Sequence, residues 1–382
     1  MFELIIYVFD ALLTLVIIFI AWKLRFAYKH FKMKQLLSGP SMLQQLPSVS
    51  VCIPARNEMH AMTQCLERVL ASTYPKLEII VLDDSSADNT SVLIKSFAHA
   101  GVRFVEGASL PDGWLGKNHA LQGLLDEASG SYILYMDVDT DIEPDTIGQL
   151  VTYLAQENIA MVSVLPRRVD AWRASVLLGT LRYYWELILH RHKAPAVASS
   201  AWMIQRHVLI NQLGGFEPLK NYIQPEEKLA GMLMAKGLYR FLIGTKDLGV
   251  SYEKKWLSQI ETGIRLLYPL FGGTLPSNVL ALAGLALFNL PLLVLAVGLF
   301  SGWGLVQTIA VLQLALLLGL YGSYLHKMRG ADWWAGTLLW PVVIAQEFIL
   351  HIVGIYRNLR HTVTWKGRPV MAEHTQRSIE RI

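Results

Sequence analysis

The sequence is poor in charge, and one long stretch has no charge at all. Only 17% of the 382 residues are Asp, Glu, Lys or Arg, whereas soluble domains usually carry about 25%. Residues 266–325 contain no Asp, Glu, Lys, Arg or His. A soluble fold does not leave so long a stretch uncharged, which excludes an ordinary soluble protein. We therefore predict a membrane protein with a water-soluble part.

Cysteine is scarce as well, and the net charge is small. Cys52 and Cys65 form no CxxC pair and are too few for a disulfide framework, which favours a reducing compartment. The formal net charge is +4, and its basic excess lies beside apolar segments, as at residues 23–34. This position suits anionic lipid head groups, so we expect a membrane partner and no nucleic acid. No feature of the sequence points to an oligomeric state.

Several common binding motifs are missing. The first strand–helix turn has no GxGxxG, and GxxxxGK[ST] occurs nowhere, which excludes a dinucleotide fingerprint and a P-loop. Residues 137–141 read DVDTD, the start of an EF-hand loop. The sixth and twelfth positions of that loop are Ile142 and Gly148, where calcium binding needs Gly and Glu. An EF-hand is therefore excluded too.

The two ends of the chain carry the membrane segments that we expect. Residues 4–22 are apolar except for Asp10, and basic residues follow them rather than precede them. This favours a retained anchor at 1–22 and a basic cytoplasmic linker at 23–46 over a cleaved signal peptide. The C-terminal membrane region, 265–356, is expected to contain spans at about 275–300 and 305–325, separated by a turn at 300–304.

A fourth apolar segment, residues 333–356, is less clear. It contains Pro341, Glu347 and His351, and the basic tail 357–382 follows it. If this segment crossed the membrane, the tail would lie outside, against the positive-inside rule. We favour a re-entrant or interfacial segment, with a full span as the alternative. A charged group in lipid marks a functional site by default, but Glu347 of an interfacial segment can also simply face water.

Residues 47–264 have the pattern of an α/β domain. Short apolar runs alternate with amphipathic stretches, which predicts a mostly parallel sheet covered by helices on both faces. The expected strands are 49–53, 78–82, 102–105 and 132–136, and the expected helices are 60–71 and 117–128.

Polar clusters follow three of these strands, at residues 54–58, 83–86 and 137–141. Such sheets bind ligands beyond the carboxyl ends of their strands, so we expect one shared crevice. Asp137 and Asp139 alternate along the third cluster and favour a magnesium or manganese site completed by water and a diphosphate. We consider Asp139 the best single metal ligand.

Two further motifs add candidate residues. Gly116-Lys117 opens a helix after a flexible turn and offers a cation and backbone N–H groups for a phosphate. Glu226 and Glu227 follow Pro225, and they form either the acidic first turn of a helix or a general base.

These motifs together resemble the family 2 glycosyltransferases with a GT-A fold. The resemblance covers about residues 48–265 through PARNE, DDSSADNT, GWLGK, MDVDTDIEP and GGFEP followed by an acidic pair. The tail TWKGR at 364–368 and the flanking apolar segments are similar to a membrane-bound branch. That branch includes the diaponeurosporenoate (carotenoid) and hopanoid-associated glycosyltransferases.

The resemblance implies roles for individual residues. Asp84 would contact the base or ribose, Lys117 the base or diphosphate, and Asp137 and Asp139 would flank a metal-bridged diphosphate. In the family's Glu-Asp motif the second acid is the catalytic base, which here is Glu227, so this chain has Glu-Glu instead. A QxxRW element is missing, and its region holds Trp256, Gln259 and Arg265. The nucleoside pocket would be lined by Pro54, Ala55, Arg56 and Glu58.

The function implied is an inverting sugar transfer at the cytoplasmic face of the cell membrane. We expect a nucleotide-diphosphate donor, a UDP-hexose in particular, and a lipid acceptor such as a carotenoid acid, a hopanoid or a glycerolipid. The alternative is a nucleotide-sugar-binding membrane protein without transferase activity that assists lipid or polysaccharide export. The altered acidic pair and the missing QxxRW motivate that alternative. A processive polysaccharide synthase is disfavoured because QxxRW is associated with processivity.

Overall fold

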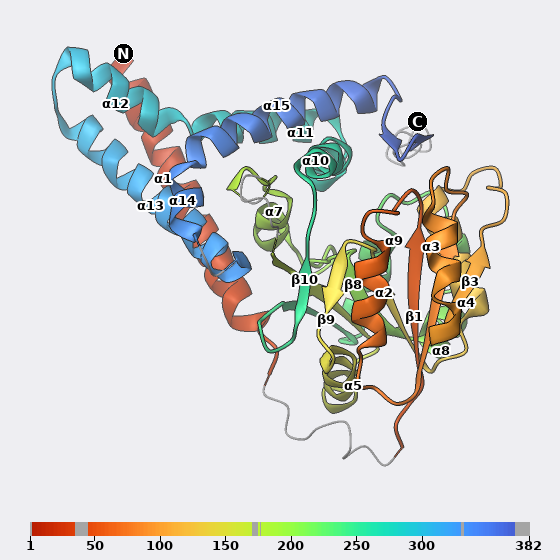
Figure 1. The fold of residues 1–382 in the computed structure, drawn as a ribbon. Coiled ribbons are helices and arrows are strands. Elements are labelled where there is room, and N and C mark those ends of the chain that lie inside the picture. The colour runs from red at the N-terminus through yellow and green to blue at the C-terminus, as the bar shows by residue number, and fades with distance from the viewer. Residues whose placement is uncertain (1, 35–44, 170–174, 176, 330–331, 371–382) are drawn as a thin grey trace.

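The structure, a computed structural model, describes residues 2–34, 45–169, 175, 177–329 and 332–370. A seven-stranded sheet lies at the centre of its water-soluble part, with strand order β3-β2-β1-β4-β8-β6-β9 (Figure 1). Strands β1 to β4 pair in parallel, β8 runs antiparallel to both β4 and β6, and β9 is parallel to β6. The predicted α/β fold with a mixed, mostly parallel sheet is therefore confirmed. The strands are β1 Val49–Ala55, β2 Leu77–Asp83, β3 Val102–Glu106, β4 Tyr132–Met136, β6 Met161–Leu165, β8 Ala201–Gln205 and β9 Tyr239–Ile243.

Helices cover both faces of this sheet because its strands bury side chains on both sides. Cys52 of β1 belongs to the apolar cluster on one face, and its neighbours Val51 and Ile53 belong to the cluster on the other. Both cysteines are buried and unpaired, as expected of small apolar residues. The helices are α2 Met62–Leu70, α3 Thr90–Ser96, α4 Gly116–Glu127, α5 Thr146–Gln156, α7 Arg182–Leu189, α8 Arg206–Asn211 and α9 Pro225–Met234, with 3₁₀ turns at Ala98–Ala100 and Glu217–Leu219.

A small second sheet extends the carboxyl end of β4. Its order is β5-β10-β7, formed by Thr140–Ile142, Val250–Tyr252 and Arg167–Arg168. Strand β10 pairs antiparallel with β5 and parallel with β7. This sheet therefore fixes the segment that follows Asp137 against the chain that leads into the C-terminal helices.

Within the described residues, four helical segments are long and apolar enough to cross a membrane: Ile5–His30, Leu275–Phe300, Leu305–Arg329 and Trp340–Leu359. In Figure 1, α1, α12 and α13 gather on one side, while α11 and α15 run over the carboxyl ends of the sheet strands. The helices are α1 Phe2–His30, α10 Trp256–Leu270, α11 Leu275–Leu287, α12 Leu290–Ser301, α13 Leu305–Arg329, α14 Trp333–Leu338 and α15 Trp340–Leu359.

Two of the expected boundaries differ from the observed helices. Helix α1 continues to His30, past the expected linker start, because residues 23–30 contain no helix breaker and Lys23 donates to the His190 carbonyl (2.6 Å). The expected span 275–300 consists of α11 and α12, which break at Phe288-Asn289 just before Pro291. The turn between α12 and α13 lies where it was expected. Residues 35–44 of the expected linker fall outside the described residues.

Helix α15 packs along α10 and α11 and is joined to α7 and the preceding residue by buried polar contacts. Glu347 is fully buried and accepts hydrogen bonds from Trp185 Nε1 (2.9 Å) and Leu181 N (3.2 Å). His351 contacts Asn278 of α11 (2.8 Å). Glu347 thus does not face water. The interfacial placement of 333–356 stays a prediction, since α15 is also long and apolar enough to cross.

Candidate active site

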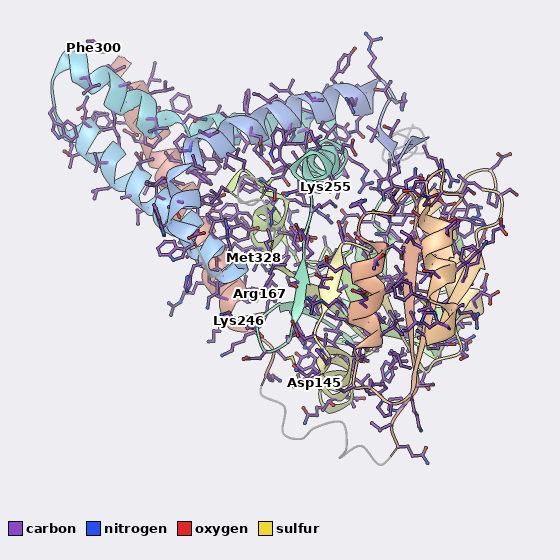
Figure 2. All side chains as sticks on the ribbon, viewed as in Figure 1. Asp145, Arg167, Lys246, Lys255, Phe300 and Met328 are labelled. Atoms are coloured by element: carbon purple, nitrogen blue, oxygen red, sulfur yellow. The ribbon has the colours of Figure 1, made fainter. Side chains whose placement is uncertain are left out.

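A cavity of about 490 Å³ lies beyond the carboxyl ends of β1 and β4. Its walls come from both parts of the molecule: Asp137 follows β4 of the central sheet, whereas Tyr324 belongs to α13, one of the apolar helices. Figure 2 shows Lys255 at the start of α10, between the apolar helices and the sheet. The predicted residues that line the cavity are Pro54, Arg56, Glu58, Lys117, Asp137 and Asp139.

Two carboxylates of the DVDTD segment are each paired with a lysine. Lys117 Nζ lies 2.8 Å from Asp137 Oδ1, and Lys254 Nζ lies 3.7 Å from Asp139 Oδ2. Burial alone would raise the pKa of Asp137, but Lys117 outweighs it and holds that pKa below its usual value. Burial raises the pKa of Asp139 in spite of Lys254. Asp141 also lines the cavity and accepts from Gln64 Nε2 (2.8 Å).

This arrangement fits a divalent ion held together with a ligand. Asp137 and Asp139 offer the hard oxygen ligands that divalent ions prefer. The ammonium groups of Lys117 and Lys254 lie beside these carboxylates, in the position that a metal ion would take. Among the described residues, no group of three or more His, Cys, Asp and Glu side chains is arranged to hold a metal ion by itself. An ion at Asp137 and Asp139 would therefore take its remaining ligands from water and from the molecule bound beside it.

The residues expected to line a nucleoside pocket are only partly exposed to the cavity. Pro54, Arg56 and Glu58 line it, whereas the side chain of Ala55 is buried in β1. Asp84 is 4% exposed and is not part of the cavity wall, because a cation from the end of the chain covers it.

That cation belongs to a hairpin which the sequence did not place in the site. Strands β11 Thr364–Trp365 and β12 Arg368–Pro369 pair through a tight turn at Lys366-Gly367, where both φ angles are positive. Arg368 Nη1 donates to both Asp84 oxygens (2.9 and 2.7 Å). Lys366 pairs with Glu58 and donates to the Arg56 carbonyl (2.7 Å).

The residues of this contact are visible in the sequence, but the sequence does not show that they lie close together. The sequence shows two cations flanking Gly367 in a C-terminal motif, and two acids, Glu58 and Asp84, that follow the first two strands. Nothing in the sequence connects positions nearly three hundred residues apart. The path of α15 over the sheet brings them together (Figure 1).

Glu226 and Glu227 lie in the first turn of α9, so they do form the acidic first turn of a helix. Glu226 is 1% exposed and lines a second cavity of about 40 Å³, together with Lys117 and Arg265. Its Oε2 atom has no hydrogen-bond partner in the part of the chain that the structure describes. Glu227 is half-buried and lines neither cavity. The placement therefore favours Glu226, not the Glu227 preferred from the sequence, as the acid that faces the site.

Burial raises the pKa of Glu226 above its usual value, although Lys117 opposes this effect. A raised pKa makes a carboxylate a stronger proton acceptor than an exposed one. Of the three residues in the QxxRW region, Gln259 is structural, since it donates to the Ser175 and Lys254 carbonyls (both 2.8 Å). Arg265 faces both cavities.

Comparison with known proteins identifies the part of the chain that carries this site. Residues 50–209 match Glycosyl transferase family 2. The probable glycosyltransferase YdaM of Bacillus subtilis is 29% identical over 187 residues, covering 46% of this chain and 44% of that protein. The undecaprenyl-phosphate 4-deoxy-4-formamido-L-arabinose transferase of Proteus mirabilis is 29% identical over 136 residues, covering 35% of this chain and 41% of that protein. The chain thus spans less than half the length of these two relatives.

One solved structure resembles nearly the whole chain. The mannosyltransferase PcManGT of Pyrobaculum calidifontis, in complex with GDP-Man and Mn²⁺, aligns with a TM-score of 0.56 at 19% identity. The alignment covers 93% of this chain and 99% of that one. At this identity the likeness shows the fold, and it confirms the expected GT-A architecture.

Proposed function

We propose, from the premise that residues 50–209 form a glycosyl transferase family 2 domain, that this protein transfers a sugar from a nucleotide-diphosphate donor to a lipid acceptor. One observation carries the proposal. A single cavity holds the carboxylates Asp137 and Asp139 of the family domain and also reaches Tyr324 of α13. The carboxylates proposed to bind the donor and a residue of an apolar helix therefore line the same cavity.

The donor would be a UDP-hexose or a related nucleotide sugar. Asp137 and Asp139 would hold Mg²⁺ or Mn²⁺, and the ion would supply charge neutralisation for the diphosphate. Lys117, the second residue of α4, would lie beside the same diphosphate and stabilise the charge that develops as it leaves. The complex of the mannosyltransferase with GDP-Man and Mn²⁺ supports this combination.

The transfer would invert the anomeric carbon. The acceptor oxygen attacks that carbon from the face opposite the diphosphate, and no covalent sugar–enzyme intermediate forms. Glu226 would accept a proton from an acceptor hydroxyl or orient the acceptor. Glu227, the base implied by the resemblance, would act through its neighbour, because it lines neither cavity.

The acceptor would reach the site from the membrane. The basic flanks of the apolar helices, at residues 23–34 and 326–329, favour a cytoplasmic position for the catalytic domain. Candidate acceptors are a carotenoid acid, a hopanoid, a glycerolipid or, following the name of the Proteus mirabilis relative, a polyprenyl phosphate. A carrier protein that binds nucleotide sugars without transferring them is the second candidate, favoured by the altered acidic pair.

The test is turnover by the full-length purified protein in lipid nanodiscs. Incubation with UDP-glucose, Mn²⁺ and a bacterial lipid extract is expected to release UDP and to yield a hexosylated lipid in the mass spectrum. Donor binding without either product, measured by calorimetry on the same sample, would favour the carrier function and contradict the transferase.

A further inference from the structure

Helix α15 carries a buried acid that the proposed mechanism does not use. Glu347 is fully buried, and it lies in a helix made mostly of apolar residues. Burying a carboxyl group is costly, and an ionisable residue in an apolar helix of a membrane protein marks a functional site by default. Glu347 lines neither the main cavity nor the second one. Its role must therefore lie in what it contacts.

Two hydrogen bonds join Glu347 to the start of α7. Its Oε1 atom accepts from the indole Nε1 of Trp185 (2.9 Å), and its Oε2 atom accepts from the N–H of Leu181 (3.2 Å), the residue just before the helix. Gln346, next to Glu347, donates to the carbonyl of Leu178 (2.8 Å). N–H groups at the start of a helix lack partners within it, and a negative charge there is favourable. Two neighbouring residues of α15 therefore hold the chain where it enters α7.

The segment held in this way is part of the wall of the main cavity. Thr180, Arg182 and Tyr183 line that cavity, and Leu181 lies between them in the chain. Helix α10 approaches the same segment closely, since a Cβ at Gly263 would lie 3.2 Å from Thr180 Cγ2. The position of this wall therefore depends on both α10 and α15.

Helix α7 lies between α15 and the sheet (Figure 1) and extends the contact toward the proposed metal site. Glu186 of α7 accepts from Val197 N (2.9 Å), at the start of the segment 197–200. At the end of that segment, the carbonyl of Ser200 accepts from Asp137 N (3.0 Å). A displacement of α7 would therefore reach both the cavity wall and the backbone of Asp137.

We propose that Glu347 is a positioning residue for the sugar transfer: it anchors the start of α7 to α15 and thereby fixes the wall of the main cavity at residues 180–183. This role rests on the proposed function, and it adds a residue that touches neither the donor nor the acceptor. Small displacements of the groups that align two reactants have large effects on rate, about 100-fold for 1 Å. An anchor outside the cavity can therefore control the reaction inside it.

The first experiment compares two substitutions of buried polar residues on the same helix. Glu347→Leu removes the contacts with α7. His351→Leu, the matched control, removes a residue that is equally buried one turn further along but contacts Asn278 of α11 (2.8 Å). With the full-length protein in nanodiscs, UDP-glucose, Mn²⁺ and a bacterial lipid extract, Glu347→Leu is expected to raise the KM for UDP-glucose about fivefold and to lower kcat about tenfold. His351→Leu leaves α7 anchored and is expected to change both by less than about twofold.

The KM for UDP-glucose separates positioning from a loss of folded protein. A variant that merely folds less well gives a lower apparent kcat with an unchanged KM. Glu347→Gln keeps the shape and one acceptor oxygen, so it is expected to restore part of the loss. If Glu347→Leu does not fold, Trp185→Phe removes one of the two donors and is expected to shift the KM in the same direction by a smaller factor. Equal KM changes in Glu347→Leu and His351→Leu, or unchanged KM values in Glu347→Leu and Trp185→Phe, overturn the inference.

Hydrogen exchange measures the anchoring directly and needs no substrate. The amides of residues 178–184 are expected to exchange faster in Glu347→Leu than in the wild type, because the Leu181 N–H loses its acceptor. His351→Leu is expected to leave their exchange unchanged.

A failure of the proposed function gives a different result. If the wild type transfers no glucose, binding of UDP-glucose with Mn²⁺ is measured by calorimetry on the same nanodisc samples. Faster exchange at 178–184 together with weaker binding in Glu347→Leu supports the inference while the transferase proposal fails. Unchanged exchange at 178–184 contradicts the inference by itself, and so does faster exchange with unchanged binding.

Discussion

Two parts of the main cavity differ in how their charges are balanced. Two carboxylates of the DVDTD segment each have a cation close by: Asp137 has Lys117, and Asp139 has Lys254. Arg182 and Arg265 line the same cavity, but their short-range contacts are aromatic rings and a hydroxyl. Burial alone would lower the pKa of Arg182, but Tyr183, Glu186 and Glu226 nearby outweigh it and raise that pKa. The charge is thus balanced by direct ion pairs at the DVDTD segment and by more distant groups around Arg182.

The strongest test of the donor side removes one carboxylate charge. Asp139→Asn is expected to lower kcat at least about 100-fold, because the charge that anchors the ion and the diphosphate is lost. The rate of UDP release at saturating Mn²⁺ measures this effect. Asp141→Asn makes the same charge change two residues away, in a side chain that binds Gln64, and is expected to lose less than about tenfold. Equal losses of kcat in both variants would contradict the assignment of the metal site to Asp139 rather than Asp141.

A substitution in the β11–β12 hairpin is expected to have a smaller effect than Asp139→Asn. Arg368→Gln removes the closer of the two cations beside the buried Asp84 and leaves only Arg56, at 4.0 Å, so an anionic donor is repelled and its KM rises about tenfold. Arg357→Gln, at an exposed position in the last turn of α15, is the control. Steady-state kinetics with varied donor measure the change. A lower donor KM would instead show that the hairpin blocks the nucleoside pocket.

Gly116→Ala is expected to disturb the same ion pair, Arg368 with Asp84. A Cβ at Gly116 would lie 2.7 Å from Arg368 Nη1 and 3.1 Å from Asp84 Oδ2, so the pair must shift. The donor KM is expected to rise in the same direction as for Arg368→Gln, but by a smaller factor. An unchanged donor KM in both variants would separate the hairpin from donor binding.

The central sheet was predictable because its strands are continuous apolar runs that end in polar clusters. The expected strand 132–136 is the observed β4 Tyr132–Met136, and Asp137 and Asp139 line the cavity beyond it. These features depend on neighbours in sequence and on one rule about parallel sheets. Local pattern was sufficient for them.

The features that the sequence did not predict depend on which way a residue faces on its helix, or on packing between segments far apart in the chain. Adjacent residues of a helix point about 100° apart, so the pattern PEE could not tell which glutamate of α9 faces the site. The contact of Arg368 with Asp84 depends on where α15 ends, and that follows from its packing on α10 and α11. The break between α11 and α12 is signalled by Asn289 and Pro291, but an apolar run of that length also suits one straight span.

The smallest expected effect concerns Glu186, another buried acid near the main cavity. Glu186 of α7 is 7% exposed and accepts from Val197 N (2.9 Å), and burial raises its pKa to about 7. The unfolded chain loses this proton near pH 4.5, the ordinary value. Between these two values the folded state holds a proton that the unfolded state has released. The contribution of Glu186 to stability is therefore full below about pH 4.5 and is lost as the pH rises through 7.

Glu186→Gln keeps the shape of the side chain and removes this titration. From pH 5 to pH 7 the wild-type protein is expected to lose stability relative to the variant by up to about 1.4 kcal/mol per pH unit. Thermal unfolding in detergent at several pH values measures the difference, and Glu217→Gln, an exposed acid, is the control. Parallel pH profiles for wild type and Glu186→Gln would mean that a nearby cation neutralises Glu186. Arg182, four residues earlier on α7, is the cation placed to do so.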